Sequence, residues 1–257
     1  MDAAVELHHR EDGPPDAPAV VLLHGGGSRG ATWDLFTPAL LAAGHRVVVP
    51  DLRGHAGSPR SRPYTLEHHR DDVIALLDRL RLDRLTLIGH SLGGFAATLV
   101  AQAQPDRVTR LVLEDPPVPP RHTGAGKVSL GRLLLLSIGT ADPRRRYDRL
   151  ALTSAITQLR QAHPGWWDAL PAITAPTLLL SGGPSSHIAP VRLAEMAALI
   201  PRCELVTVPV GHRVHSTAPE EFRRTVMHFL GDAVRDGTSA PTSPASPMDG
   251  AAGEEQP

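Results

Sequence analysis

Short apolar runs separated by amphipathic segments dominate the pattern of this 257-residue sequence. The runs are rich in Val, Ile and Leu, mostly lack polar–apolar alternation, and fall at 19–23, 47–49, 85–88, 111–113, 177–180 and 204–208. Such runs are typical of strands covered on both faces, as in a parallel sheet. Segments with helical spacing lie between them, at 66–80, 92–103, 191–200 and 218–230. The alternation predicts an α/β fold, with a doubly wound, mostly parallel sheet of about seven strands and helices on both faces.

Two segments depart from this rhythm. Residues 5–9 are expected to form an antiparallel edge strand, pairing with 19–23 through a turn at 13–18. The interval 116–171 contains helical runs at 128–138, 147–162 and 163–170 but no strand signal. We expect it to form a helical lid over the carboxyl edge of the sheet, where ligands bind in open α/β folds.

The remaining segments divide into a core and a tail. Residues 1–115 and 172–235 are expected to form the α/β core. The last segment, 236–257, is rich in Pro, Ser, Gly and Ala, with Met248 as its only large apolar residue. Such a composition buries too little surface to offset the entropy of ordering, so we predict a disordered tail.

Composition excludes several classes of protein. No apolar run approaches the roughly 18 residues of a membrane span, and Cys203 is the one cysteine, which excludes an internal disulfide and a cysteine zinc cluster. The net charge of −1 is unlike that of a nucleic-acid binder. The 14 histidines include no His-Glu-x-x-His motif, so neither a metal nor a cofactor is expected. The first ten residues do not form a secretory signal, and we expect a cytoplasmic protein whose partner is a small molecule.

The motif Gly89-His90-Ser91-Leu92-Gly93 lies directly after the run at 85–88 and directly before the helical segment 92–103. This is the strand–turn–helix context that a Gly-x-Ser-x-Gly nucleophile elbow requires. The glycines permit a tight turn with close backbone approach. The helix N-terminus adds a positive dipole beside the serine, where an oxyanion would form. Ser91 is therefore the predicted nucleophile; the alternative is a purely structural turn.

Three further stretches accompany this motif: His24-Gly25-Gly26-Gly27 after the first run, Asp51 to Ser58 after the second, and Val210-Gly211-His212 after the last. With them, the chain resembles the α/β-hydrolase fold family over about residues 3–232. The resemblance implies an oxyanion hole made by the N–H groups of Gly26 and Leu92, with Gly27 as the alternative to Gly26. It implies His212 as the general base, with His215 as the alternative; His90 is interpreted as structural.

The triad acid departs from the family pattern. The family usually places an aspartate after the strand that is here 177–180, but that position falls at Ser186, and no carboxylate occurs between Asp168 and Glu195. Some members carry the acid at the end of the strand after the nucleophile helix. That position predicts Asp115, with Glu114 as the alternative, because strand alternation lets only one of the two point toward His212. A third hypothesis is that no working acid exists.

These residues predict a serine hydrolase that cleaves an ester-like acyl bond of a small, fairly apolar substrate through a Ser-Asp-His triad and an acyl-enzyme. Thioester, lactone or carbon–carbon bond hydrolysis and acyl transfer remain alternatives, because they use the same apparatus. Serine at position 91 argues against the dehalogenase and epoxide-hydrolase branches, which use aspartate there. A non-catalytic ligand-binding protein on the same scaffold is the alternative of another class, favoured by Ser186 and disfavoured by an intact Ser91 and His212.

Overall fold

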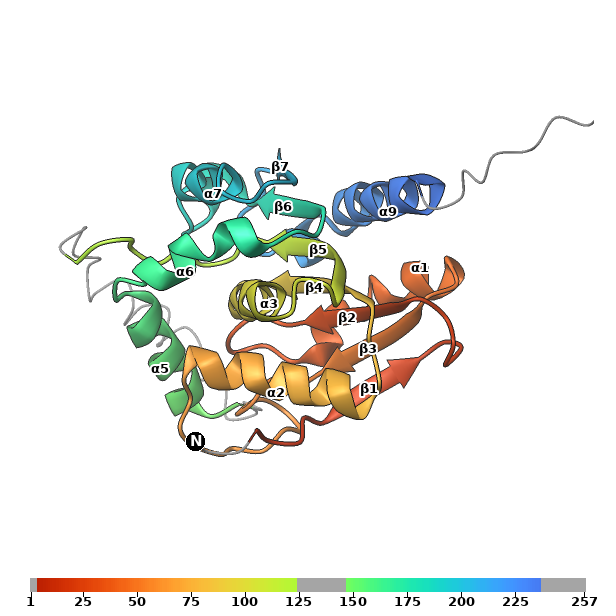
Figure 1. The fold of residues 1–257 in the computed structure, drawn as a ribbon, viewed down its shortest axis with the longest axis horizontal. Coiled ribbons are helices and arrows are strands. Elements are labelled where there is room, and N and C mark those ends of the chain that lie inside the picture. The colour runs from red at the N-terminus through yellow and green to blue at the C-terminus, as the bar shows by residue number, and fades with distance from the viewer. Residues whose placement is uncertain (1–3, 124–146, 237–257) are drawn as a thin grey trace, which may run out of the picture.

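A computed structural model describes residues 4–123 and 147–236, and a seven-stranded sheet forms its centre (Figure 1). The strand order is β1-β3-β2-β4-β5-β6-β7. All neighbouring pairs are parallel except β1 with β3. The predicted α/β fold with an antiparallel edge is therefore confirmed. The strands are β1 (His9–Asp12), β2 (Ala19–Leu23), β3 (Arg46–Pro50), β4 (Leu85–His90), β5 (Val108–Glu114), β6 (Thr177–Ser181) and β7 (Cys203–Thr207).

The expected partner of the N-terminal strand was wrong. β1 pairs with β3, with His9 opposite Pro50 and Asp12 opposite Val47, and not with β2. The reason is that β2 has no unpaired edge, because β3 and β4 pair with its two sides. The strand also begins at His9, four residues later than expected.

Helices cover both faces of the sheet, as Figure 1 shows. On one side lie α2 (Leu66–Arg79), α3 (Leu92–Ala103) and α7 (Pro190–Ala197); on the other lie η1 (Gly30–Trp33), α1 (Thr37–Ala42), α8 (Val214–Thr217) and α9 (Pro219–Asp236). Within β2, Val21 and Leu23 pack into the first layer, whereas Val20 and Leu22 pack into the second. Burial on both faces explains why these strands lack alternation in the sequence.

The described part of the connection from β5 to β6 contains three helices, α5 (Arg149–Leu159), α6 (Pro164–Asp168) and η2 (Leu170–Ala172). Trp166 of α6 stacks on Phe95 of α3, and its indole N–H donates to Thr98 Oγ1 at 2.8 Å. In Figure 1, α5 lies at the edge of the sheet where the parallel strands end. The helix predicted at 128–138 lies outside the described residues, as does the tail from residue 237 onward.

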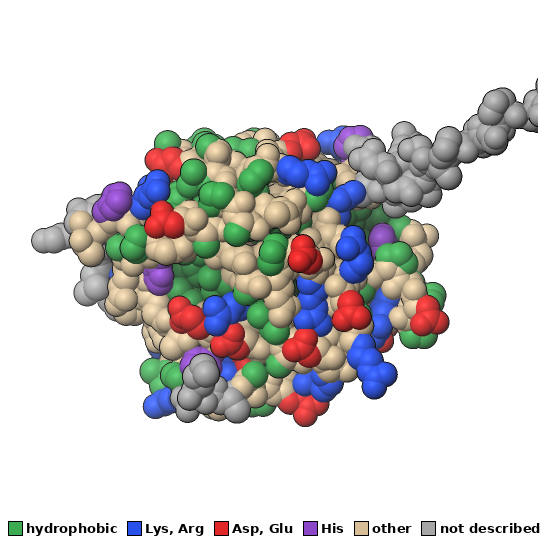
Figure 2. Space-filling model, viewed as in Figure 1, with side chains coloured by type: hydrophobic (Ala, Val, Ile, Leu, Met, Phe, Trp, Pro, Cys, Tyr) green, Lys and Arg blue, Asp and Glu red, His purple; other side chains and the backbone are tan. Residues whose placement is uncertain are grey.

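The surface in Figure 2 carries acidic and basic side chains interspersed over the face shown, consistent with the net charge of −1. Within residues 4–123 and 147–236, no helix combines the length and the hydropathy that crossing a bilayer would demand.

Several histidines are buried in the folded chain. Burial lowers the pKa of His24, His69 and His90 to about 3, because desolvation penalises the charged imidazolium. Burial also lowers the pKa of His55. These side chains are therefore neutral in the native protein at physiological pH. Both ring nitrogens of His69 lack a hydrogen-bond partner among the described residues.

This burial predicts a loss of stability in mild acid. The unfolded chain protonates these histidines below pH of about 6.5, whereas the native state protonates three of them only near pH 3. Their full contribution to the free energy of unfolding is therefore present above about pH 6.5 and is lost as the pH is lowered. Each histidine contributes a slope of about 1.4 kcal/mol per pH unit, or roughly 4 kcal/mol for the three. Urea unfolding between pH 7 and pH 5.5 measures the slope.

The variant His69→Leu should reduce that slope by the contribution of one histidine, since it removes one buried imidazole. His122→Gln, at an exposed position, is the matched control and should leave the slope unchanged. A free energy of unfolding that stays constant over this pH range would contradict the prediction.

Candidate active site

Ser91 lies at the junction of β4 and α3 with φ 49° and ψ −119°, a left-handed conformation that is rare for a residue other than glycine. The turn is very tight. A Cβ atom on Gly89 would lie 2.5 Å from the carbonyl oxygen of Gly93, and one on Gly93 would lie 2.5 Å from that of Leu23. Only glycine fits at both positions, so the chain has the geometry that the nucleophile-elbow motif predicts.

Asp115 follows the last residue of β5, and its side chain is fully buried. Its Oδ1 accepts a hydrogen bond from the Gly182 N–H at 2.9 Å, and its Oδ2 lies 2.7 Å from His212 Nδ1. Because an ionised carboxylate can only accept, Nδ1 carries the proton, and in the neutral ring Nε2 is left with a lone pair. The structure thus brings together two of the three predicted triad residues, in the tautomer that a general base requires.

Ser186 lies at the position where the resemblance predicts the family's usual aspartate, and it contacts Asp115, the acid predicted in its place. Its hydroxyl donates to Asp115 Oδ2, the same oxygen that faces His212. Its own Oγ accepts from the Ile188 N–H at 3.0 Å. The loop after β6 therefore supplies two donors, the Gly182 N–H and the Ser186 hydroxyl, that hold one carboxylate from the end of β5.

The alternative residues Glu114 and His215 pair with each other. His215 Nδ1 lies 2.7 Å from Glu114 Oε2, and both side chains are buried. Burial raises the pKa of the Glu114 carboxyl, but the electrostatic interaction with the His90 ring and the hydrogen bonds from His215 outweigh it and leave that pKa below its usual value. Within the described residues, neither side chain is hydrogen-bonded to Asp115 or His212, so the pair forms a second carboxylate–histidine contact beside the first.

His90, interpreted as structural from the sequence, binds the backbone of the neighbouring loop. Its Nε2 donates to the carbonyl oxygen of His212 at 2.9 Å. Burial keeps this ring neutral, with its pKa lowered to about 3. His90 therefore helps to hold the loop that carries His212.

Two neutral histidines hold the glycine loop. His24 Nε2 accepts from the Leu52 N–H at 2.9 Å, and His55 Nε2 accepts from the Gly27 N–H at 3.0 Å. The Gly27 N–H is thus already engaged. The N–H groups of Gly26 and Leu92, by contrast, donate no hydrogen bond to another residue within the described part of the chain. The two residues are neighbours in space, because a Cβ atom on Gly26 would lie 3.7 Å from Leu92 Cβ.

The structure does not join every predicted partner. Across the described ranges, the Ser91 hydroxyl forms no hydrogen bond with His212, whose side chain is 22% exposed. Sequence reasoning also missed His187, an exposed residue whose ring centroid lies 3.9 Å from that of His212. Its place beside Ser186 in the loop after β6 was the one available signal.

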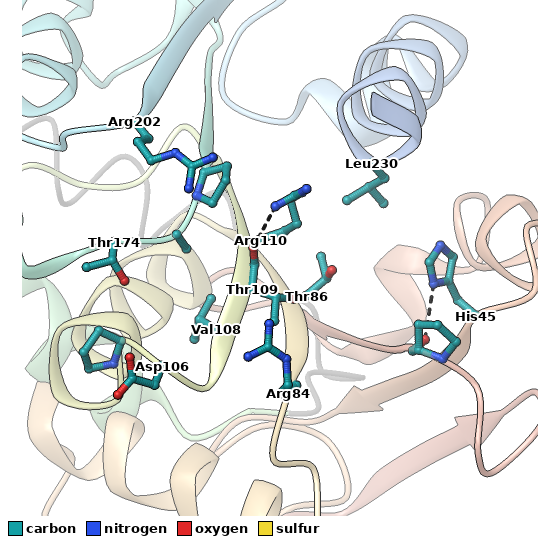
Figure 3. A pocket seen from close by; sticks show the side chains of 14 residues that line it. His45, Arg84, Thr86, Asp106, Val108, Thr109, Arg110, Thr174, Arg202 and Leu230 are labelled. Carbon is teal, nitrogen blue, oxygen red and sulfur yellow. Dashed lines mark hydrogen bonds between the residues drawn. The ribbon is translucent and has the colours of Figure 1, made fainter. Parts of the chain in front are cut away.

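A hollow of about 550 Å³ lies far from these residues, at the edge of the sheet where the strands begin (Figure 3). Arg84, Arg110 and Arg202 line it, near the starts of β4, β5 and β7. Because Ser91, Asp115 and His212 all follow the carboxyl ends of strands, this hollow is not part of the candidate active site.

Known proteins share both the sequence pattern and the fold. The sequence profile described as "Alpha/beta hydrolase family" matches residues 20–225. The sn-1-specific diacylglycerol lipase ABHD11 of Mus musculus is 32% identical, over 85% of this chain and 83% of its own length. The 2-hydroxy-6-oxononadienedioate/2-hydroxy-6-oxononatrienedioate hydrolase 2 of Pseudomonas putida is 30% identical, over 88% and 92%. The enol-lactonase of Burkholderia xenovorans LB400 superposes with a TM-score of 0.74 at 26% identity, over 89% and 99%.

The chain belongs to the alpha/beta hydrolase family. It is a hydrolase, and the predicted resemblance is confirmed over residues 20–225.

Proposed function

We propose that this protein is a serine hydrolase that cleaves an ester-like acyl bond of a small, fairly apolar molecule through Ser91, His212 and Asp115. The observation that carries the proposal is the 2.7 Å contact between His212 Nδ1 and the fully buried carboxylate of Asp115. A buried carboxylate that holds a histidine in the Nδ1–H tautomer is what a general base next to a serine needs. The relatives named lipase and enol-lactonase support an ester, open or cyclic, as the bond cleaved.

The reaction proceeds through two acyl transfers. His212 Nε2 accepts the Ser91 hydroxyl proton while Ser91 Oγ bonds to the acyl carbon, and the imidazolium then protonates the leaving alcohol. Water repeats the sequence on the acyl-enzyme and releases the acid. Asp115 stays ionised throughout and stabilises the imidazolium. Ser91 and His212 come into hydrogen-bond contact when substrate is bound, since such contacts are often longer in the absence of a ligand.

The developing oxyanion is stabilised by the N–H groups of Gly26 and Leu92. Both lack another acceptor among the described residues, and they come from adjacent segments of chain. Engagement of the Gly27 N–H by His55 favours Gly26 over Gly27 as the donor. Two pre-positioned donors of this kind supply several kcal/mol of transition-state stabilisation.

Residues 116–171, described at 116–123 and 147–171, act as the lid of the proposed core. The Asp148 N–H, just before α5, donates to the Gly54 carbonyl at 2.7 Å, which anchors the helix to the loop after β3. Leu152 of α5 faces the glycine loop, because a Cβ atom on Gly26 would lie 2.9 Å from Leu152 Cδ1. A substrate carbonyl that reaches the Gly26 N–H must therefore pass beside Leu152, so this side chain limits the acyl group.

Ser91→Ala tests the proposal directly. The variant should fold like the wild type but lose labelling by a fluorophosphonate probe and about 10³-fold or more of its turnover of p-nitrophenyl butyrate. Probe labelling that survives in the variant would sink the proposal and favour a non-catalytic binding protein.

Moving the acid tests the role of Asp115. Asp115→Asn should cut turnover by about 10⁴-fold, because the amide can donate to Nδ1 and stabilise the wrong tautomer. Adding Ser186→Asp should restore turnover by at least about tenfold, or ~1.4 kcal/mol of transition-state stabilisation. The reason is that the Ser186 hydroxyl contacts Asp115 Oδ2, the oxygen that faces His212. Asp115→Asn with Ser185→Asp, at an exposed neighbour, is the control and should restore nothing. Equal turnover in the two double variants would contradict this geometry.

Leu152→Ala tests the lid. Removing this side chain should raise the ratio of kcat/KM for p-nitrophenyl octanoate over acetate by about tenfold, a change typical of a few methylenes in an apolar pocket. Leu150→Ala is the matched control on the same helix, because Leu150 is 45% exposed. An unchanged ratio in the Leu152 variant would place the acyl pocket elsewhere.

A further inference from the structure

The end of β5 carries a second buried carboxylate that the proposed reaction does not use. Glu114 is fully buried, and its oxygens accept from the His215 backbone N–H at 2.9 Å and face His215 Nδ1 at 2.9 and 2.7 Å. An ionised group in such surroundings is costly unless its partners are kept in place. The contact therefore fixes both the ring and the backbone of His215.

Glu114 also contacts the serine turn. Its carbonyl oxygen accepts from the Ser91 N–H at 2.9 Å, and it stands opposite His90 in the register of β4 and β5. Its side chain and that of Asp115 leave the strand end separately and meet two histidines that follow β7, namely His215 in α8 and His212 in the loop before it. Glu114 and Asp115 together therefore position the serine turn, His212 and His215.

The far side of the His215 ring reaches the segment after the glycine loop. His215 Nε2 lies 2.8 Å from Thr32 Oγ1 in η1, and the ring lies against Trp33, with centroids 4.7 Å apart. Phe222 of α9 packs nearby, at 6.1 Å between centroids. Since apolar rings surround these polar contacts, the segment that carries His212 and His215 cannot shift without breaking the hydrogen bonds of His215.

A metal ion is not the better explanation of this cluster. His90, Glu114 and His215 lie close enough to offer three ligands. However, both ring nitrogens of His215 and both oxygens of Glu114 already have partners. His90 Nδ1, which has no hydrogen-bond partner among the described residues, faces the Gly25 backbone closely, since an added Cβ on Gly25 would lie only 2.6 Å away.

We propose that Glu114 and His215 form a second carboxylate–histidine pair that does not react but positions His212 relative to Ser91 and the glycine loop. This inference rests on the proposed function. Glu114 and His215 are positioning residues, and the chemistry stays with Ser91, His212 and Asp115.

Kinetics of the full-length protein with p-nitrophenyl butyrate test the proposal. Glu114→Gln should lower kcat by about 10²-fold, the effect of a displacement near 1 Å, with KM nearly unchanged. His215→Asn, whose amide can still donate to Glu114, should retain more activity than His215→Ala. Glu195→Gln, which removes an exposed carboxylate paired with Arg192, is the control and should leave both constants unchanged.

A second readout does not depend on turnover. The imidazole N–H proton resonance of His212, assigned by its loss in His212→Gln, reports the bond to Asp115. It should shift in Glu114→Gln and His215→Ala but not in Glu195→Gln. A folded Glu114→Gln protein with a lower Tm but wild-type kcat and an unshifted resonance would overturn the proposal.

If Glu114→Gln does not fold, Thr32→Val decides, because it removes only the contact at His215 Nε2 and keeps the side-chain volume. A smaller fall in kcat with a shifted His212 resonance supports the proposal, and no change in either overturns it. Failure of the proposed function itself would appear separately, as turnover that survives in Ser91→Ala.

Discussion

Two negative charges buried side by side at the end of β5 constrain the rest of the candidate active site. Glu114 and Asp115 are both fully buried, and removing one partner from such a group costs about 3–5 kcal/mol. Each carboxylate therefore needs several donors. The loop after β6 supplies the Gly182 N–H and the Ser186 hydroxyl to Asp115. After β7, the loop supplies His212 to Asp115 and α8 supplies His215 to Glu114. These segments therefore supply the donors that the two buried carboxylates at the end of β5 need.

The opposite wall of the site depends on neutral side chains. His24 and His55 each accept a backbone N–H through Nε2, and each donates through Nδ1 to a carbonyl, that of Gly25 or Arg53. Burial lowers the pKa of both rings, which keeps Nε2 unprotonated and able to accept. Protonation of Nε2 on either ring would place a second N–H against the backbone N–H that this nitrogen now accepts, that of Leu52 or Gly27. The burial that keeps these rings neutral beside the proposed oxyanion donors is therefore also expected to make the fold sensitive to acid.

Much of the fold was predictable from the sequence, because burial on both faces leaves a continuous apolar run wherever a central strand lies. The partner of β1 was not, since sequence order favours the adjacent strand and only the complete sheet shows that β2 has no unpaired edge. The short helices α1 and α8 were missed because four to six residues carry too little periodicity to detect. In the site, elimination pointed to Asp115, since the loop after β6 holds no carboxylate. The contacts of His215 with Glu114 and Thr32 join residues up to 183 positions apart, and no local pattern encodes them.

Backbone conformation explains why the acid at the end of β5 is aspartate at position 115. Asp115 has φ 45°, in the left-handed region that non-glycine residues seldom adopt and that aspartate and asparagine adopt most readily. That conformation ends the strand abruptly, and its N–H still donates to the Leu180 carbonyl of β6 at 2.8 Å. The short side chain then turns toward the loops after β6 and β7, whereas Glu114, still in the strand, points to His215. A longer carboxylate side chain at 115 would fit neither this backbone nor the close contacts with Gly182, Ser186 and His212. Backbone and charge therefore select the same residue, which is why a serine at the family's more common acid position leaves the histidine still paired with a carboxylate.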